Sequence, residues 1–192
     1  MSTAFLRSAD KSRLSVKVQT IATIAAIVGA VAVPQLFHAL GAASGLGTSL
    51  GETFLPMHLP IIIVGLLAGP YAGAIAGALG PLVSFAVSGM PGADMLPFMM
   101  LELCAYGLFA GLLRNVKMPA VIKVIAVQIG GRAVRAAAIL LAVYAFGNES
   151  VRAASILMSI GTGLFGLALQ WTLIPLLVYR VENPKKKGAL IR

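Results

Sequence analysis

The chain of 192 residues has little charge: Asp, Glu, Lys and Arg make up 11% of it, and hydrophobic residues make up 59%. A soluble domain normally carries about 25% charged residues. The single cysteine, Cys104, excludes an intrachain disulfide. The sequence also has no His-x-x-x-His pair, no cluster of metal ligands and no P-loop motif. We therefore expect neither a catalytic centre, a metal site nor a cofactor, and any dependence on ATP must come from partners.

Long apolar runs occupy most of the chain. A helix needs about 20 apolar residues to cross a bilayer, and the runs are continuous rather than alternating, which favours helices over a barrel. The sequence predicts an all-α integral membrane protein: a single bundle of six transmembrane helices over 17–180, with basic segments at 1–16 and 181–192. The expected spans are 17–40, 54–69, 72–88, 96–113, 120–146 and 152–179.

The positive charge is unevenly distributed between the connections. The net charge is +9, and 12 of the 15 Lys and Arg lie before span 1, around the connection between spans 4 and 5, or after span 6. The 1–2 and 3–4 connections carry no Lys or Arg, only Glu52 and Asp94. By the positive-inside rule, both termini are expected to be cytoplasmic. We interpret the basicity as topogenic and as binding anionic lipid of the bilayer, and we expect no nucleic-acid partner.

Span 1 carries a stripe of small residues, Ala22, Ala26 and Ala30, at four-residue spacing. Such spacing places them on one helix face, where another helix can approach closely. The pattern leaves two interpretations open: packing inside the bundle, or contact with a different protein.

Three charged residues lie well within the spans, away from their ends: Glu102, Arg132 and Arg135. Charge in the bilayer costs at least about 2.5–3.5 kcal/mol per group, so these side chains normally face the interior or a cavity. Arg132 and Arg135 share a helix face because they are three residues apart. A Glu102–Arg135 pair that only orders the bundle is one interpretation, and it leaves a surplus arginine. The other is an outward-facing site for an anionic solute, since arginine binds carboxylates bidentately.

Other polar and flexible side chains lie near the outer ends of spans 2 and 4. His58, on the outer turn of span 2, either binds a ligand or donates to a backbone carbonyl. Five methionines gather near the outer mouth in sequence, and methionine provides a pliable apolar lining. They are Met57, Met90, Met95, Met99 and Met100.

The motifs of this region resemble those of the substrate-binding membrane subunits (S components) of energy-coupling-factor (ECF) vitamin transporters. The resemblance covers about a third of the chain and rests on the order of several short motifs. They are Leu55-Pro56-Met57-His58-Leu59-Pro60, Gly65 to Gly69-Pro70 with Gly73, Gly80-Pro81-Leu82, Ser88-Gly89-Met90-Pro91, Glu102-Leu103, Tyr106-Gly107 with Gly111, and Gly131-Arg132.

The resemblance implies a subunit that binds a vitamin from outside, associates with a transmembrane coupling subunit and two ABC-type ATPases, and topples in the membrane to release its cargo. It implies a docking role for Ala22, Ala26 and Ala30, because the family carries an alanine motif on its first helix. It implies a pocket role for Glu102, Tyr106, Met57, His58 and the Gly89-Met90-Pro91 loop. The pattern looks most like the pantothenate and cobalamin branches, and the arginines favour pantothenate.

Two function classes compete with this interpretation. A small integral-membrane enzyme could also have six helices and a Glu–Arg set, but Glu102 would be its only acid within the membrane. An uncoupled channel or exporter is the other alternative.

Overall fold

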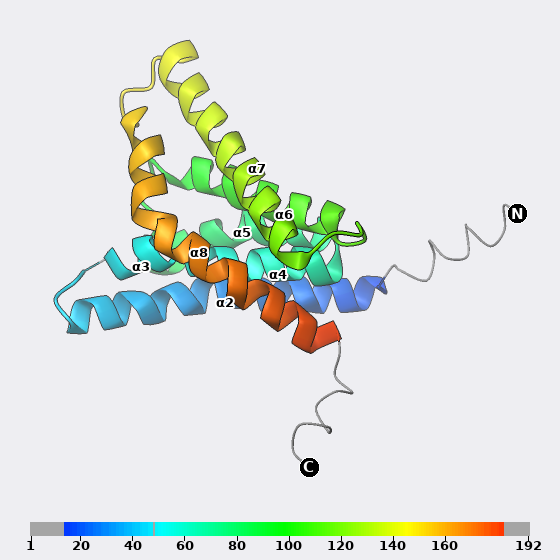
Figure 1. Cartoon of the computed structure of the whole chain (residues 1–192). Helices are drawn as coiled ribbons and strands as arrows, with labels where there is room; N and C mark the ends of the chain where they lie inside the picture. Colours follow the sequence, from blue (N-terminus) through cyan, green and yellow to red (C-terminus); the bar gives the residue numbers. More distant parts are fainter. Residues whose placement is uncertain (1–13, 48, 183–192) are drawn as a thin grey trace, which may run out of the picture.

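The computed structural model describes residues 14–47 and 49–182, which form helices and contain no strand (Figure 1). The predicted segments 1–16 and 181–192 fall largely outside these residues. Six stretches of the described chain are long and apolar enough to span a membrane, which confirms the all-helical, six-span prediction. The elements are α2 (Val16–Ala43), α3 (Ser49–Phe54), α4 (His58–Ala68), α5 (Pro70–Ser88), α6 (Leu96–Leu113), α7 (Ala120–Leu140), the π-helical turn η1 (Leu141–Ala145) and α8 (Ala154–Glu182).

Local chemistry explains several helix ends. The hydroxyl of Ser15 accepts the N–H of Val18 at 3.4 Å and caps the start of α2. Pro70 occupies the first position of α5, where no N–H is needed. Gly89 ends α5 in the left-handed conformation, with φ of 70°. The single residue Gly69 joins α4 to α5, so the tight hairpin expected between spans 2 and 3 is present.

The second span is broken, which the sequence did not predict. Residues 55–57 separate α3 from α4, and Leu55 has φ of 49°. Positive φ is uncommon outside glycine and is costly for a bulky side chain. The break turns the chain at the end of the bundle, and α3 packs against α2 and α8.

Glycines bring α5 and α6 into backbone contact. A Cβ added to Gly107 would lie 2.0 Å from the carbonyl oxygen of Gly73, and one on Gly77 would lie 2.1 Å from that of Leu103. No larger residue fits without moving the helices. Inside a membrane, such close van der Waals packing drives helix association, because the hydrophobic effect does not act between helices there.

The alanine stripe of α2 faces the same bundle. Ala30 is 0% exposed and Ala26 is 6% exposed, and both belong to the main apolar core, with Ala22 packed at its edge. Ala30 lies against Gly80 of α5, where an added Cβ would come within 3.3 Å of it. In this structure Ala26 and Ala30 therefore serve internal packing, and the docking role of Ala22, Ala26 and Ala30 stays a prediction. The opposite face of α2 is exposed at Ile24, Ala25 and Val28.

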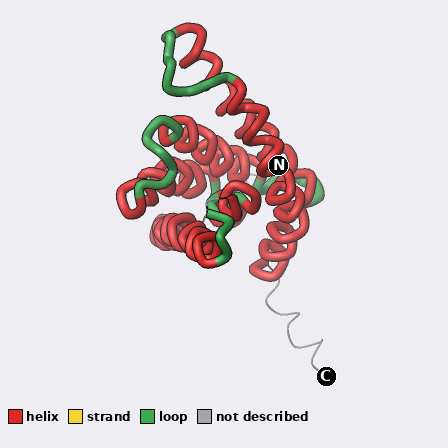
Figure 2. The backbone as a smooth tube through the Cα atoms, turned by 90° about the vertical axis from the view of Figure 1, so that its left-hand side faces the viewer, coloured by secondary structure: helices red, strands yellow, loops and turns green. Residues whose placement is uncertain are grey.

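The ends of α7 and α8 diverge from the rest of the bundle. In Figures 1 and 2, η1, the adjoining end of α7 and the start of α8 project beyond the layer of α2–α6. The start of α2, the α6–α7 connection and the end of α8 lie together at the opposite end (Figure 1). This arrangement leaves a space between the α3–α4 break, the α5–α6 connection and α7–α8.

Candidate binding site

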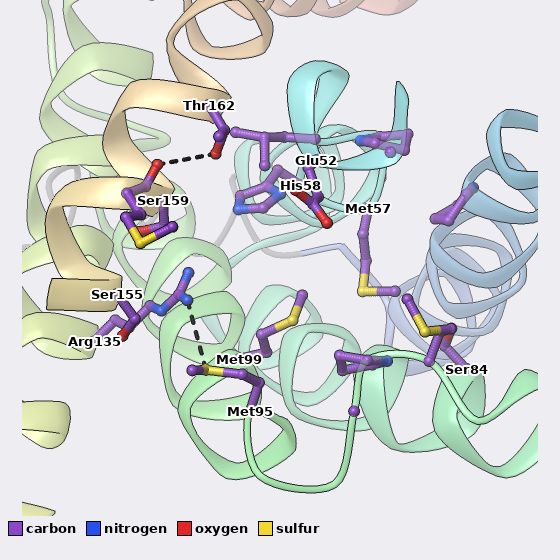
Figure 3. A pocket seen from close by; sticks show the side chains of 18 of the residues that line it. Glu52, Met57, His58, Ser84, Met95, Met99, Arg135, Ser155, Ser159 and Thr162 are labelled. Atoms are coloured by element: carbon purple, nitrogen blue, oxygen red, sulfur yellow. Dashed lines mark hydrogen bonds between the residues drawn. The ribbon is translucent and has the colours of Figure 1, made fainter. Parts of the chain in front are cut away.

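A cavity of about 470 Å³ occupies this space. Ligand pockets normally have volumes of about 300–1,000 Å³. Figure 3 shows side chains from both halves of the chain pointing into it. The lining residues are Pro34, His38, Gly51, Glu52, Leu55, Pro56, Met57, His58, Ser84, Met90, Pro91, Gly92, Met95, Met99, Arg132, Arg135, Ser155, Met158, Ser159 and Thr162.

One part of the wall is soft and apolar. It contains four of the five methionines grouped from the sequence, together with Met158 of α8; Met100 does not line the cavity. Flexible thioether side chains adapt to irregular ligand shapes.

The other part of the wall is basic and hydroxylated. Arg132 and Arg135 project from successive turns of α7 and are 12% and 14% exposed. Nη1 of Arg132 donates to Oγ of Ser159 at 3.3 Å, and Nη2 of Arg135 lies 3.9 Å from Sδ of Met95. Gly163 of α8 leaves room for Arg132, whose Nη2 would lie 3.2 Å from an added Cβ.

Glu102 lies behind the arginines and does not line the cavity. Its side chain is 0% exposed, with Oε1 3.2 Å from Nε of Arg132 and Oε2 3.1 Å from Nη1 of Arg135. The predicted Glu102–Arg135 pair is present, but Arg132 contacts the same carboxylate. The sequence predicted that one arginine would be left unpaired. Instead both arginines contact Glu102, and one positive charge remains in excess.

Tyr106 supports Glu102 from one turn further along α6. Its hydroxyl donates to Oε1 of Glu102 at 2.8 Å, and its side chain is fully buried. A Cβ on Gly131 would lie 2.2 Å from the Tyr106 ring, so this glycine allows the ring to pack against α7. Like Glu102, Tyr106 does not line the cavity, so neither residue is placed to touch a ligand there as predicted.

His58 and Met57 are at the cavity, where the sequence placed them. His58 is 3% exposed, its Nε2 is 3.8 Å from Oε1 of Glu102, and neither ring nitrogen has a hydrogen-bond partner. The predicted alternative of a bond to a backbone carbonyl is therefore wrong for this structure. In the predicted loop, Met90 and Pro91 line the cavity, whereas Gly89 serves as the cap of α5.

Several lining residues were missed from the sequence. Ser155, Ser159 and Thr162 lie on one face of α8, at spacings of four and three residues. Hydroxyls that recur at helical spacing in an apolar run are a signal that could have found them.

A Gly-x-Ser-x-Gly spacing occurs at residues 47–51. In hydrolases this spacing marks a nucleophile when it joins a strand to a helix. Here Ser49 is exposed, starts the short helix α3 and donates its hydroxyl to the carbonyl of Leu46. The setting is not that of a nucleophile elbow.

Among the described residues, no group of three or more His, Cys, Asp and Glu side chains is arranged to hold a metal ion. The arginines, hydroxyls and methionines of the lining offer a bound molecule positive charge, hydrogen-bond donors and apolar contact.

Comparison with known proteins identifies the family. The model of the family described as "ECF transporter, substrate-specific component" matches residues 19–179. No curated protein and no solved structure matches the chain. The resemblance found in the motifs is confirmed for the family, while the match does not distinguish the pantothenate and cobalamin branches. The chain therefore belongs to the substrate-specific components of ECF transporters, multi-pass membrane proteins that are subunits of transporters and associate with ECF transmembrane and ATPase subunits.

Proposed function

We propose that this protein captures an anionic vitamin, pantothenate, from outside a prokaryotic cell and presents it to an ATP-driven ECF importer. The binding site is the cavity between the α3–α4 break, the α5–α6 connection and α7–α8. The partners are one transmembrane coupling subunit and two ABC-type ATPases.

One observation carries the proposal: buried donors at the cavity wall lack partners. Nη2 of Arg132, Nε of Arg135 and Oγ of Ser155 are inaccessible to solvent and form no hydrogen bond. More than about 90% of buried polar groups in proteins are hydrogen-bonded. A carboxylate bound beside Arg132 and Arg135 would accept from these donors once their side chains turn toward it, and bonds to charged groups are the strong ones.

The cavity also favours a small cargo over cobalamin. Its volume is about 470 Å³, and a corrin macrocycle with its nucleotide loop is several times larger than pantothenate. Pantothenate combines one carboxylate with an amide, two hydroxyls and a branched apolar part. The methionines and hydroxyls of the wall match these groups.

The proposed orientation places the cavity at the extracellular side. The α6–α7 connection carries Arg114 and Lys117 and lies at the opposite end of the bundle from the cavity (Figure 1). Positive connections face the cytoplasm. Both termini would then be cytoplasmic.

A binding experiment tests the cargo and the basic wall together. The purified protein is titrated with pantothenate by calorimetry, as wild type and as Arg132→Gln and Arg135→Gln. Each substitution removes a charge-assisted bond, so we expect affinity to fall by roughly 10- to 100-fold. Arg152→Gln is the matched control because Arg152 is exposed and lies outside the cavity lining. Affinities unchanged in both cavity variants would overturn the proposed site.

Purification from native membranes tests the assembly. Mass spectrometry should find the coupling subunit, two ATPases and a retained vitamin. Cobalamin in place of pantothenate would change the cargo but keep the class, whereas a subunit with neither partners nor ligand would contradict the proposed function.

A further inference from the structure

Glu102 lies beside both arginines of the cavity wall but does not line the cavity. It is 0% exposed, absent from the lining, and lies 3.2 Å and 3.1 Å from the two arginines. Removing a carboxylate from water is costly unless it is paired and hydrogen-bonded. Both arginines and the Tyr106 hydroxyl meet that need, so the carboxylate is a fixed negative charge directly behind the binding wall.

The net charge of the side chains at this wall determines which ligand charge would balance it. Two guanidiniums are always protonated, and one carboxylate opposes them, so with a neutral imidazole at His58 the buried cluster carries a net charge of +1. The carboxylate of Glu52, which also lines the cavity, is exposed on α3, where water screens its charge. The inner wall is therefore short of one negative charge.

We propose that Glu102 is the specificity-determining residue that sets this site to accept a monoanion and to reject both neutral analogues and multiply charged ones. This inference rests on the proposed function and deepens it. A monoanion neutralises the cluster, whereas a dianion leaves a buried negative charge and a neutral ligand leaves a buried positive one. Either imbalance is expensive in a low-dielectric site. The cargo class is thus a small acid with one charge and an otherwise uncharged body.

Three ligands with no negative charge, one, and more than one provide the test. They are pantothenate, its alcohol analogue with CH₂OH in place of the carboxylate, and its phosphate monoester at the terminal hydroxyl. Binding is measured at pH 8, where an ordinary imidazole is neutral. The readout is the ratio of affinities within each variant, because a ratio is insensitive to a general loss of affinity.

In wild type, pantothenate should bind better than either analogue. Glu102→Gln raises the cluster to +2 and should shift the ratio of phosphate ester to pantothenate upward by about tenfold or more. Arg132→Gln lowers the cluster to zero and should shift the ratio of alcohol to pantothenate upward by a similar factor. Glu149→Gln makes the same chemical change at an exposed residue between η1 and α8 and should leave both ratios unchanged.

Two further variants separate charge from folding. Glu102→Asp keeps the charge and should keep the wild-type order even if affinity falls. If Glu102→Gln does not fold, the affinity ratios of the analogues to pantothenate in Arg132→Gln and Glu102→Asp still test whether charge sets the specificity. Ratios in Glu102→Gln or Arg132→Gln equal to those of Glu149→Gln would overturn the charge inference alone. Failure of wild type to bind pantothenate would overturn the proposed cargo, and this inference with it.

Discussion

The side-chain amide of Gln170 donates to the backbone carbonyl of Leu55 at 3.2 Å, joining the middle of α8 to the break between α3 and α4. Gln170 is 1% exposed, and its own oxygen accepts from Nε2 of Gln128 at 3.1 Å. The oxygen of Gln128 in turn accepts from Nε1 of Trp171 at 2.7 Å. This network is bonded to Leu55, whose φ is positive, and we expect it to position the following segment, which carries Met57 and His58 to the cavity.

Gln170→Leu should weaken cargo binding. The substitution leaves the amide of Gln128 without a partner, at a cost of about 1–3 kcal/mol. It also removes one of the two hydrogen bonds to the carbonyl of Leu55, which keeps the N–H of His58 at 3.1 Å. Residues 55–58 lose a hydrogen bond that holds them at the cavity. We therefore expect both a lower melting temperature and several-fold weaker binding in a calorimetric titration.

Gln19→Leu is the matched control for that prediction. Gln19 also donates its amide to a backbone carbonyl, that of Leu14 at 2.7 Å, but at the far end of α2. Its loss should not change affinity. If Gln170→Leu lowers only the melting temperature and not the affinity, the network stabilises the fold without positioning residues 55–58.

Gly107→Ala should destabilise the bundle. The new Cβ would lie 2.0 Å from the carbonyl oxygen of Gly73, and backbone cannot rotate away as a side chain can. Overpacking typically costs about 1–3 kcal/mol, which thermal unfolding in detergent will detect. Gly161→Ala is the control, since nothing lies within 4 Å of its added Cβ, and this variant should be as stable as wild type or slightly more so. Equal stability of the two variants would contradict the close α5–α6 packing.

Tyr106→Phe should lower affinity without altering charge preference. The hydroxyl orients Glu102 through a 2.8 Å hydrogen bond but carries no charge, so its loss loosens the cluster and keeps its net charge. We expect affinity for pantothenate to fall by about 3- to 10-fold, corresponding to a hydrogen bond of roughly 1 kcal/mol. Tyr144→Phe, at a side chain that is 77% exposed, should behave as wild type. A changed ratio between pantothenate and its phosphate ester in Tyr106→Phe would show that the hydroxyl does more than orient Glu102.

Two alanine substitutions on α2 separate internal packing from docking. Ala30→Leu places a large side chain against Gly80 in the core and should lower the melting temperature of the isolated subunit. Ala25→Leu alters the exposed face and should leave that temperature unchanged. Co-purification with the coupling subunit then shows which face docks. Loss of the complex in a well-folded Ala30→Leu, with Ala25→Leu unaffected, would support the docking role inferred for the stripe.

Much of the architecture follows from patterns that are local in the chain. Bilayer thickness sets the length of each apolar run, so the six spans could be predicted to within a few residues. Periodicity likewise placed Arg132 and Arg135 on one face. The break at residues 55–57 escaped notice because Leu55 is not a residue type that marks positive φ. Its carbonyl is bonded by Gln170, which lies 115 residues away in the sequence.

The sequence by itself determined that the chain crosses a membrane six times, which family it resembles, and that Glu102, Arg132 and Arg135 must face the interior or a cavity. Charged side chains are too costly to expose to lipid. Only the tertiary structure decided that Glu102 stands behind the arginines instead of facing the cavity, and that Ala26 and Ala30 pack inward. Helical spacing defines a face but not what covers it, because the direction of each face depends on how all six spans pack together.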